Sequence, residues 1–264
     1  MLLKGILMKI YVGVCTFAYK YLRVFSTLEV QRTFYNIPKP VTVEKWKKEA
    51  PRDFIYNFKI FQGITHELNS PTWRRYTGKD KEELRGKVGS FKLNKKTMEY
   101  WDTMTKIAKT LNARVMVAQT PPKFNPTNLN IGNIRKTFEY LKNKFEEEKI
   151  KTLIGWEPRG EWLNKKEDTI IVIKDFDNVI HVVDLIHHEP LLHHEVYYFR
   201  LHGIPYLNYK YTYTLRDYGL IMGKIERLED EGAKEVFVMF NNVNMVQNAK
   251  KFKDYLEGKG WKVY

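Results

Sequence analysis

The chain has 264 residues, 43% of them hydrophobic, so it is long enough to bury a substantial core in one domain. Its net charge of +14 favours anionic or phosphorylated partners over cationic ones, although a Lys- and Glu-rich surface is also typical of heat-adapted proteins. The single cysteine, Cys15, excludes an internal disulfide and fits a reducing cytoplasm, where we expect the protein to reside.

Residues 1–7 precede the first predicted strand, and we expect them to form a frayed extension of a single domain that spans 1–264. Lys4 and Lys9 interrupt the apolar opening, and no small-residue cleavage site follows it. A signal sequence is therefore not expected. No run approaches the ~20 apolar residues of a membrane span, so no membrane association is expected.

Eight short apolar runs, each ending in a polar or charged residue, predict eight β-strands. They cover residues 9–15, 27–35, 53–60, 114–120, 152–159, 179–184, 196–203 and 235–242. Apolar residues at spacings of three and four predict helices between most of them. These helices cover 18–25, 43–50, 97–111, 131–148, 167–176, 217–231 and 245–257. Strands that alternate with helices imply a parallel sheet, and eight such units imply an α/β fold, a single TIM-type (β/α)8 barrel.

Two connections depart from this regular pattern. The sixth, which contains HHEPLLHHE, is short and broken by Pro190, so no regular helix is expected after strand six. The third forms a long loop over residues 65–96, with His66, Arg74 and Arg75 and then a charged stretch. Such a loop at the strand-end face is either a lid or substrate platform, or a self-packed excursion that closes the barrel top.

One face of the predicted strands is almost wholly apolar, and the other carries the candidate chemistry. In a (β/α)8 barrel the active site lies at the carboxyl ends of the strands. The polar set on this second face or at the strand ends comprises Cys15, Glu29, Gln31, Thr33, Asn57, Lys59, Gln119, Glu157, Arg159, Asp184, Arg200, His202 and Asn241.

The fifth strand ends in GWEPRGEW, which places Glu157 and Arg159 two residues apart and so on one face. They could form an ion pair that only neutralises both charges, or serve as general base or metal ligand with an anion clamp. Because two charges in a barrel mouth are costly to desolvate, the functional interpretation is favoured.

The seventh strand, YYFRLHG, places Arg200 and His202 on one face. An arginine beside a histidine suits the binding and protonation of a phosphate or carboxylate ester. We expect Arg200 to face Glu157 across an apolar-walled mouth, and Asp184 to orient His202. A lone histidine is more often a hydrogen-bonded structural group, but this combination favours function.

Four of these groups could hold a divalent ion if their strands converge: Glu29, Glu157, Asp184 and His202. Lys59 and Arg200 argue against a metal, because cations in the same mouth compete for the carboxylates. No cofactor is otherwise indicated. The histidines of the sixth connection resemble a metal tract, but loop residues are the favoured interpretation; they are His187, His188, His193 and His194.

Tyrosines alternate after the seventh strand, and interleaved Lys210 and Arg216 would let them stack on bases or sugars. A β-hairpin edge or barrel cap would show the same alternation. These tyrosines are Tyr206, Tyr209, Tyr211 and Tyr213. Cys15 could be a nucleophile, but a small buried filler is favoured.

Seven segments occur in the order and spacing of the YecE-like family, domain-of-unknown-function family 72. They are LEVQRTFYNIP, ITHELNSPTWRR, AQTPPKF, GWEPRGEW, HVVD, YYFRLHG and VMFNN. The chain therefore resembles this family from Met8 onward, and most closely its archaeal members. The resemblance implies a TIM-type barrel and leaves the reaction open. The family pattern falls on Glu29, Thr33, Phe34, Tyr35, Thr65, His66, Gln119, Pro121, Pro122, Glu157, Arg159, Asp184, Arg200, His202, Gly203, Asn241 and Asn242.

The leading functional hypothesis is an enzyme that hydrolyses a phosphodiester in a nucleic acid or nucleotide. The catalytic candidates are Glu157, His202, Asp184 and Glu29. The substrate-binding candidates are Lys59, His66, Gln119, Arg159, Arg200, Tyr35, Tyr211 and Asn241. An alternative is a sugar or sugar-phosphate isomerase or hydrolase that uses Glu29 and Glu157 as a carboxylate pair. A third hypothesis is a noncatalytic RNA-binding module that uses the long loop and the tyrosines.

Overall fold

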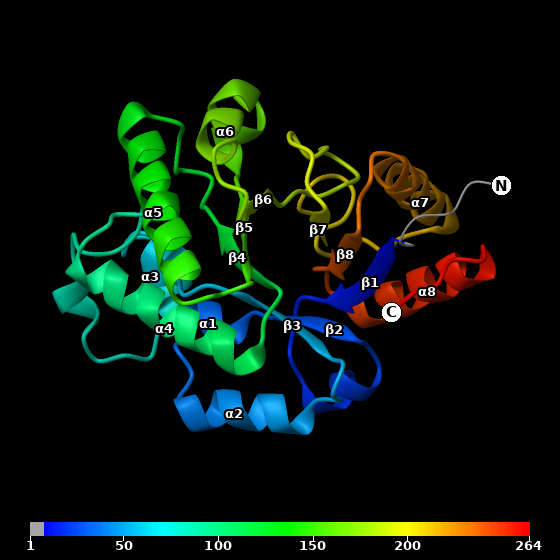
Figure 1. Ribbon diagram of the computed structural model, residues 1–264, viewed down its shortest axis with the longest axis horizontal. Helices are drawn as coiled ribbons and strands as arrows, with labels where there is room; N and C mark the ends of the chain where they lie inside the picture. Colours follow the sequence, from blue (N-terminus) through cyan, green and yellow to red (C-terminus); the bar gives the residue numbers. More distant parts are fainter. Residues whose placement is uncertain (1–7) are drawn as a thin grey trace. The chain divides into compact units, whose positions relative to one another are not determined.

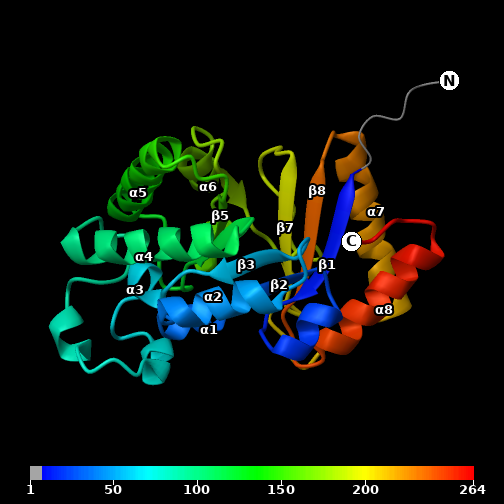
Figure 2. The ribbon, with the colours of Figure 1, turned by 60° about the horizontal axis from the view of Figure 1, so that its bottom comes forward.

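The computed structural model describes residues 8–264, whose helices and strands are shown in Figure 1 and Figure 2. Residues 1–7, predicted to be a frayed extension, lie outside the described residues. The chain divides into two compact units. Unit 1 comprises residues 8–29 and His181–Tyr264, and unit 2 comprises Val30–Ile180. The prediction of a single domain over 1–264 stays a prediction.

The described residues contain eight strands. They are β1 (Lys9–Val14), β2 (Thr27–Val30), β3 (Ile55–Lys59), β4 (Val115–Gln119), β5 (Leu153–Glu157), β6 (Val179–His181), β7 (Val196–Leu201) and β8 (Glu235–Phe240). Their α-helices are α1 (Arg32–Tyr35), α2 (Pro40–Glu49), α3 (Gln62–Thr65), α4 (Lys95–Leu111), α5 (Asn128–Glu147), α6 (Lys166–Ile173), α7 (Leu215–Asp230) and α8 (Met245–Gly258). Short 3-10 helices lie at Tyr19–Arg23, Pro71–Arg75, Lys81–Leu84 and Gly160–Leu163.

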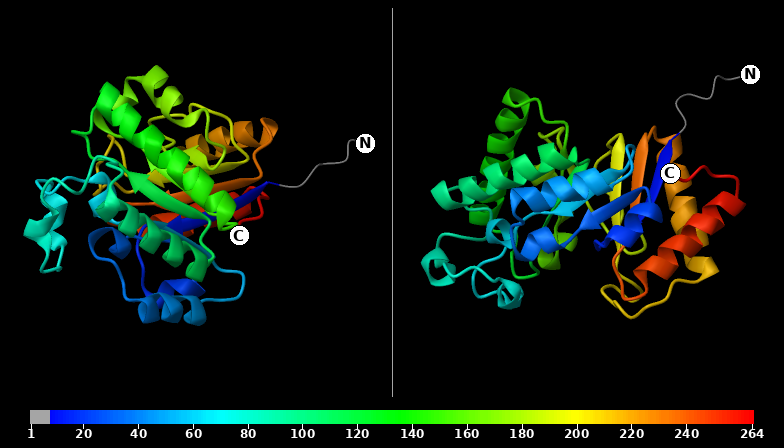
Figure 3. Two further views of the ribbon diagram at one scale, coloured as in Figure 1. Left: turned by 60° about the vertical axis from the view of Figure 1, so that its left-hand side comes forward. Right: turned by 90° about the horizontal axis from the view of Figure 1, so that it is seen from below.

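In unit 1 the strands follow the order β2-β1-β8-β7 and pair in parallel. Val14 is in register with Phe240, and Leu201 pairs with the same residue from the other side. Helix α8 packs against β1 and β8, as Figure 3 shows. The β-branched and aromatic residues of these strands are buried on both faces, as expected for a parallel sheet between helices.

In unit 2 the strands follow the order β3-β4-β5-β6, and β4 pairs in parallel with both β3 and β5. Helix α2 packs on α4, and α5 packs on α6. Because parallel strands end at one edge, the carboxyl ends of β3, β4 and β5 gather there. Eight strands with helices after most of them form the predicted fold class, a TIM-type (β/α)8 barrel. As predicted, the described connection between β6 and β7 contains no regular helix.

The second strand is shorter than predicted. It ends at Val30, and residues 32–35, which were expected to continue it, form α1. Thr33 Oγ1 donates to the carbonyl oxygens of Val30 (2.8 Å) and Lys59 (2.6 Å), which stabilises the turn away from the sheet. Thr33 and Tyr35 are therefore helical residues rather than strand residues. The sixth strand also ends early, at His181, before a single bridge between Val183 and Phe199.

Three long helices begin two or three residues earlier than predicted, because their caps set the first turn. Asn94 caps α4 and Thr214 caps α7, each in a reciprocal capping box, and Thr127 caps α5. No helix within residues 8–264 is both long and apolar enough to cross a membrane.

Candidate functional site

In unit 2, Lys59 at the end of β3 is held by β4 and α1. Its Nζ atom donates to Gln119 Oε1 at 2.8 Å and lies 3.7 Å from the centroid of the Phe34 ring. An aromatic face and an amide oxygen both favour an ammonium group. The lysine is buried, so its charge is fixed at the carboxyl edge of the sheet.

Glu157 and Arg159 form the ion pair that strand parity predicted. Arg159 donates to Glu157 Oε1 from Nε at 3.1 Å and from Nη2 at 2.7 Å, and both side chains are buried. Register places Glu157 beside Gln119, because β4 and β5 pair at these residues. The predicted residues Lys59, Gln119, Glu157 and Arg159 therefore end neighbouring strands of one unit.

His66 joins this group from the segment that follows α3. Thr65 Oγ1 lies 2.7 Å from His66 Nδ1, and the imidazole packs edge-to-face on Phe34 at 4.9 Å between centroids. Burial, followed by the charges of Lys59 and Arg159, lowers the pKa of His66 well below its ordinary value. The imidazole is therefore neutral at physiological pH. Two nearby cations, Lys59 and Arg159, act electrostatically on its ring.

A cavity of about 950 Å³ opens beside this group, within the range of small-molecule sites. The long loop and the segment after β4 form its walls, and Asn130 of α5 completes them. Its lining residues are Thr65, His66, Glu67, Asn69, Ser70, Pro71, Thr72, Ser90, Gln119, Pro121, Pro122, Lys123, Phe124 and Asn130. Two predicted substrate-binding residues, His66 and Gln119, are among them.

The long loop combines the two roles that the sequence left open. It is self-packed, because Trp73, Leu84 and Phe91 are buried and the Trp73 indole donates to the His66 carbonyl oxygen at 3.1 Å. Its start also lines the cavity. Ser90, on the cavity wall, and Phe91 both have positive φ, at 55° and 51°. Left-handed backbone at non-glycine residues is strained and tends to occur at functional sites.

In unit 1, Glu29 of β2 pairs with Arg200 of β7. The guanidinium donates from Nε and Nη2 to the two carboxylate oxygens, at 2.9 Å each, and neither side chain is exposed. Tyr198 donates to the same carboxylate at 3.0 Å, and burial, followed by the Glu29 charge, raises the pKa of this tyrosine. Strand parity predicted the location of Arg200 and Glu29, but not this pairing.

Asp184 and His202 form a second buried pair in unit 1, as predicted. Asp184 Oδ2 accepts from the His202 backbone N–H at 2.8 Å and lies 3.3 Å from His202 Nδ1. The Ile186 N–H donates to the other carboxylate oxygen at 3.3 Å. The His202 ring packs edge-to-face on Tyr209, with centroids 5.8 Å apart. A carboxylate against Nδ1 orients an imidazole for proton transfer.

The predicted common site of Glu29, Glu157, Asp184, Arg200 and His202 stays a prediction, because these residues divide between the two units. The same holds for the metal set of Glu29, Glu157, Asp184 and His202. Among residues 8–264, no group of three or more His, Cys, Asp or Glu side chains is arranged to hold a metal ion.

The remaining predicted residues have local partners. The Arg75 guanidinium lies 3.7 Å above the Tyr35 ring, and Tyr211 donates to Asp217 at 2.7 Å in the first turn of α7. Tyr213 is buried, which supports the cap interpretation of the tyrosine segment. Asn241 follows β8, where its N–H donates to Leu201. Cys15 is buried and is not part of a disulfide.

Three residues near the site were not among the predicted site residues. Phe34 supports both Lys59 and His66, while Lys123 and Phe124 line the cavity. Phe34 was assigned to a strand, so its contact with Lys59 was not foreseeable. The segment AQTPPKF does carry a signal for the other two, because paired prolines fix a loop that follows a strand end.

Comparisons with known proteins place the fold. A family model described as "Protein of unknown function DUF72" matches residues 16–263. A DUF72 family protein from Enterococcus faecalis V583 is 19% identical over 96% of this chain and 99% of its own, with a TM-score of 0.70. One from Thermotoga maritima MSB8 is 20% identical over 94% and 99%, with a TM-score of 0.65. A D-tagatose 3-epimerase-like protein is 16% identical over 96% and 98%, with a TM-score of 0.55. No curated protein matches this sequence.

Proposed function

The chain belongs to the DUF72 family, and we propose that it is an enzyme that acts on a phosphate-containing small molecule bound in the cavity of unit 2. One observation carries the proposal. A neutral imidazole, His66, lies under the field of Lys59 and Arg159 at a cavity of about 950 Å³. Burial is the largest cause of the lowered pKa of His66, and the positive charges of Lys59 and Arg159, which lower it further, favour an anionic ligand.

The charges beside the cavity indicate which anion fits. Lys123 is a cation of the wall, Lys59 contacts the lining residue Gln119, and Glu157 compensates Arg159. A phosphate ester carries one or two negative charges and several acceptor oxygens, which match lysine, arginine and a neutral imidazole that donates one hydrogen bond. The volume of the cavity is also larger than that of an inorganic anion, so the ligand carries an organic group.

The reaction favoured is hydrolysis of a phosphodiester, as in a nucleotide. Glu157 takes a proton from a water molecule, whose oxygen forms a new bond to phosphorus. The bond from phosphorus to the leaving oxygen breaks, and that oxygen takes the proton back from Glu157. Lys59 and Arg159 stabilise the charge that develops on the phosphoryl oxygens.

A sugar-phosphate isomerase is the second candidate, and the uncharged part of the cavity favours it. Hydroxyl and amide side chains dominate there, namely Thr65, Asn69, Ser70, Thr72, Ser90, Gln119 and Asn130. Such groups suit a polyhydroxylated ligand. The fold-level likeness to a D-tagatose 3-epimerase-like protein is compatible with this chemistry. A sequence with one cysteine, Cys15, supports a cytoplasmic location for either enzyme.

Phosphorus NMR separates the two reactions. The protein is incubated with a dinucleotide, bis(4-nitrophenyl) phosphate and glucose 6-phosphate, each with and without EDTA. Hydrolysis of a diester yields a monoester signal, whereas isomerisation shifts the glucose 6-phosphate signal without releasing phosphate. Loss of turnover in EDTA, restored by Mn²⁺, would support the predicted divalent ion.

Two variants test the residue roles. Glu157→Gln should lower turnover by about 100-fold or more, the scale for removing a positioned charge from a site. Lys59→Gln should weaken binding of the phosphate ester by calorimetry, while the matched surface change Lys142→Gln should not. Equal affinity in Lys59→Gln and the native protein would contradict the assignment of this cavity.

A further inference from the structure

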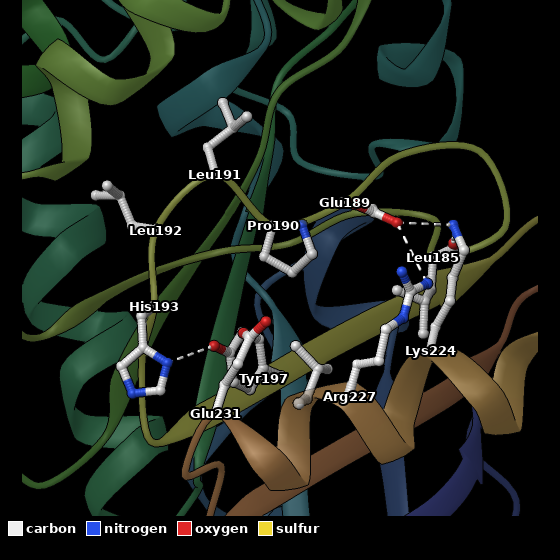
Figure 4. A pocket seen from close by; sticks show the side chains of 11 residues that line it. Leu185, Glu189, Pro190, Leu191, Leu192, His193, Tyr197, Lys224, Arg227 and Glu231 are labelled. Atoms are coloured by element: carbon white, nitrogen blue, oxygen red, sulfur yellow. Dashed lines mark hydrogen bonds and ion pairs between the residues drawn. The ribbon is translucent and has the colours of Figure 1, made fainter.

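The connection between β6 and β7 lies where this fold usually carries a helix, and residues 185–195 form it without one. We call these residues the strap. The strap and α7 enclose a cavity of about 160 Å³, shown in Figure 4. Buried Leu185, Tyr197 and Leu228 line it, and half-exposed Leu191 and Leu192 lie over it from the strap. Side-chain anchors must therefore replace the hydrogen bonds that a helix would have made.

Two imidazole nitrogens supply such anchors. The Leu191 N–H donates to His181 Nδ1 at 3.2 Å, and the Val196 N–H donates to His194 Nδ1 at 2.9 Å. Tyr197 accepts from the His194 N–H at 3.3 Å, and its hydroxyl oxygen lies 3.0 Å from His193 Nδ1 (Figure 4). The Nδ1 atoms of His181 and His194 are thus hydrogen-bond acceptors, one for the middle of the strap and one for the residue that follows it.

An imidazole nitrogen accepts a hydrogen bond only through an unprotonated lone pair, and both nitrogens of a protonated histidine are donors. Protonation of His181 or His194 therefore removes its anchor and directs an N–H donor at the backbone N–H that it held. Histidine is the side chain whose charge ordinarily changes between about pH 5 and 8. Closure of the strap is thus favoured as the pH rises and opposed as it falls through that range.

The charges around the strap carry both signs. From α7, Lys224 and Arg227 lie 3.5 Å and 3.7 Å from Glu189 of the strap (Figure 4). Lys234 lies 2.5 Å from Glu195, and Glu231 at the end of α7 faces Tyr197. The strap carboxylates are more than half exposed and already pair with cations, so they offset little of the added positive charge. Loss of the imidazole acceptors, rather than these charges, therefore determines whether the strap stays closed.

The strap is also joined to the Asp184–His202 pair. Ile186 donates to Asp184 Oδ1 at 3.3 Å, and the His187 Nε2 atom lies 2.9 Å from the carbonyl oxygen of Gly203, the residue after His202. We propose that the strap is a pH-sensitive lid: it closes the cavity over α7 and steadies the Asp184–His202 pair when His181 and His194 are unprotonated, and it opens when they gain protons.

Amide hydrogen exchange tests this lid directly, because the Leu191 and Val196 amides are held by imidazoles. Protection is measured at pH 7.5 and 5.5 and corrected for the intrinsic exchange rate. We expect protection at both amides to fall at the lower pH, because a protonated imidazole no longer accepts their hydrogen bonds. The amide of Ala233, which donates to the Leu228 carbonyl oxygen at 2.9 Å, should be unchanged.

Asparagine variants distinguish opening of the strap from a nonspecific effect of low pH on the whole protein. Asparagine places an amide oxygen near the position of Nδ1 and does not titrate, so His194→Asn should remove the pH dependence at Val196 and His181→Asn that at Leu191. His188→Asn is the matched control on the same strap, where the ring packs on Tyr206, and it should keep the full pH dependence at Leu191 and Val196. Equal protection at both pH values in the native protein, or an unchanged pH dependence in the two anchor variants, would overturn the proposal.

Discussion

Arg200 and Glu29 form a bidentate ion pair in unit 1, with both nitrogen-to-oxygen distances at 2.9 Å and both side chains fully buried. Such a pair gains Coulomb energy but loses the hydration of two charges, so its net contribution to stability is small. Removing one partner has a much larger effect, because the other charge stays buried without compensation. Variants of this pair therefore distinguish a structural role from a functional one.

Single replacements Glu29→Gln and Arg200→Met should each lower the free energy of unfolding by about 3 to 5 kcal/mol. The double variant Glu29→Leu with Arg200→Met should recover most of that loss, because neither charge is then stranded. Urea denaturation of all three proteins measures these values. If both singles are as stable as the native protein while ligand binding is lost, the pair is held for function instead.

Gly160 makes the closest backbone approach beside the candidate site in unit 2. Its φ is +69°, and a β carbon there would stand 2.2 Å from the Pro122 carbonyl oxygen. Gly160→Ala should lower the free energy of unfolding by about 2 to 4 kcal/mol through strain and overpacking together. Gly132→Ala is the control, because its β carbon would meet nothing within 4 Å in α5, and it should stabilise by about 0.5 to 1 kcal/mol. Equal thermal melts would contradict the close approach.

His66 gives a pH dependence whose sign follows from its lowered pKa. In the unfolded chain a histidine protonates near pH ~6.5, whereas His66 in the fold resists protonation to a lower pH. The unfolded state therefore binds more protons between these values. This contribution to stability is fully present above about pH 6.5 and is lost as the pH falls toward the pKa of the folded state.

Proton NMR of the His66 ring should accordingly show no titration from pH 8 down to about pH 6. In Lys59→Met its pKa should rise toward the ordinary value, although burial, the larger cause, remains. His66→Gln should flatten the dependence of unfolding free energy on pH between about 5 and 6.5. A ring that titrates near pH 6.5 in the native protein would show that Lys59 and burial do not act as described.

Much of the fold could be predicted from sequence, because buried parallel strands combine β-branched and aromatic residues with polar ends. All the predicted strands except the second and the sixth begin and end within two residues of the prediction. The prediction of the second strand was wrong beyond Val30. Thr33 and Phe34 continue the polar–apolar alternation of a strand, but the Thr33 hydroxyl donates to the carbonyl oxygens of Val30 and Lys59, and these residues form a helix instead. Helix starts failed where capping by Asn94 and Thr214 was not considered.

Two of the side-chain pairs were predicted from the sequence, Glu157 with Arg159 and Asp184 with His202. Glu157 and Arg159 lie two residues apart, so parity alone brings them together. The Lys59–Gln119 and Glu29–Arg200 pairs depend on which strands are neighbours and on side-chain reach, neither of which a single sequence contains. The cavity could not be predicted because it depends on how the long loop folds. Trp73 of this loop is buried, while the first residues of the loop line the cavity.

The basic long loop tests the remaining hypothesis, a module that binds single-stranded RNA. Arg74 and Arg75 are exposed, and Arg75 stacks on Tyr35 at 3.7 Å, which leaves a cation and an aromatic ring at one place on the loop. If both arginines contact phosphates, the affinity for single-stranded RNA should fall steeply with salt. Changing both to Ala should reduce the slope of log affinity against log salt by about 1.4, or about 0.7 for each lost contact.

Fluorescence anisotropy with a labelled oligonucleotide at several salt concentrations measures that slope. The matched control is Lys250→Ala with Lys251→Ala on α8, which removes the same charge from another surface of the chain. If both double variants flatten the slope equally, the net charge of +14 acts without a defined surface. If the native protein binds no RNA even at low salt, the charge excess is better explained by ion pairs such as Lys109 with Glu148, and the small-molecule cavity remains the site to pursue.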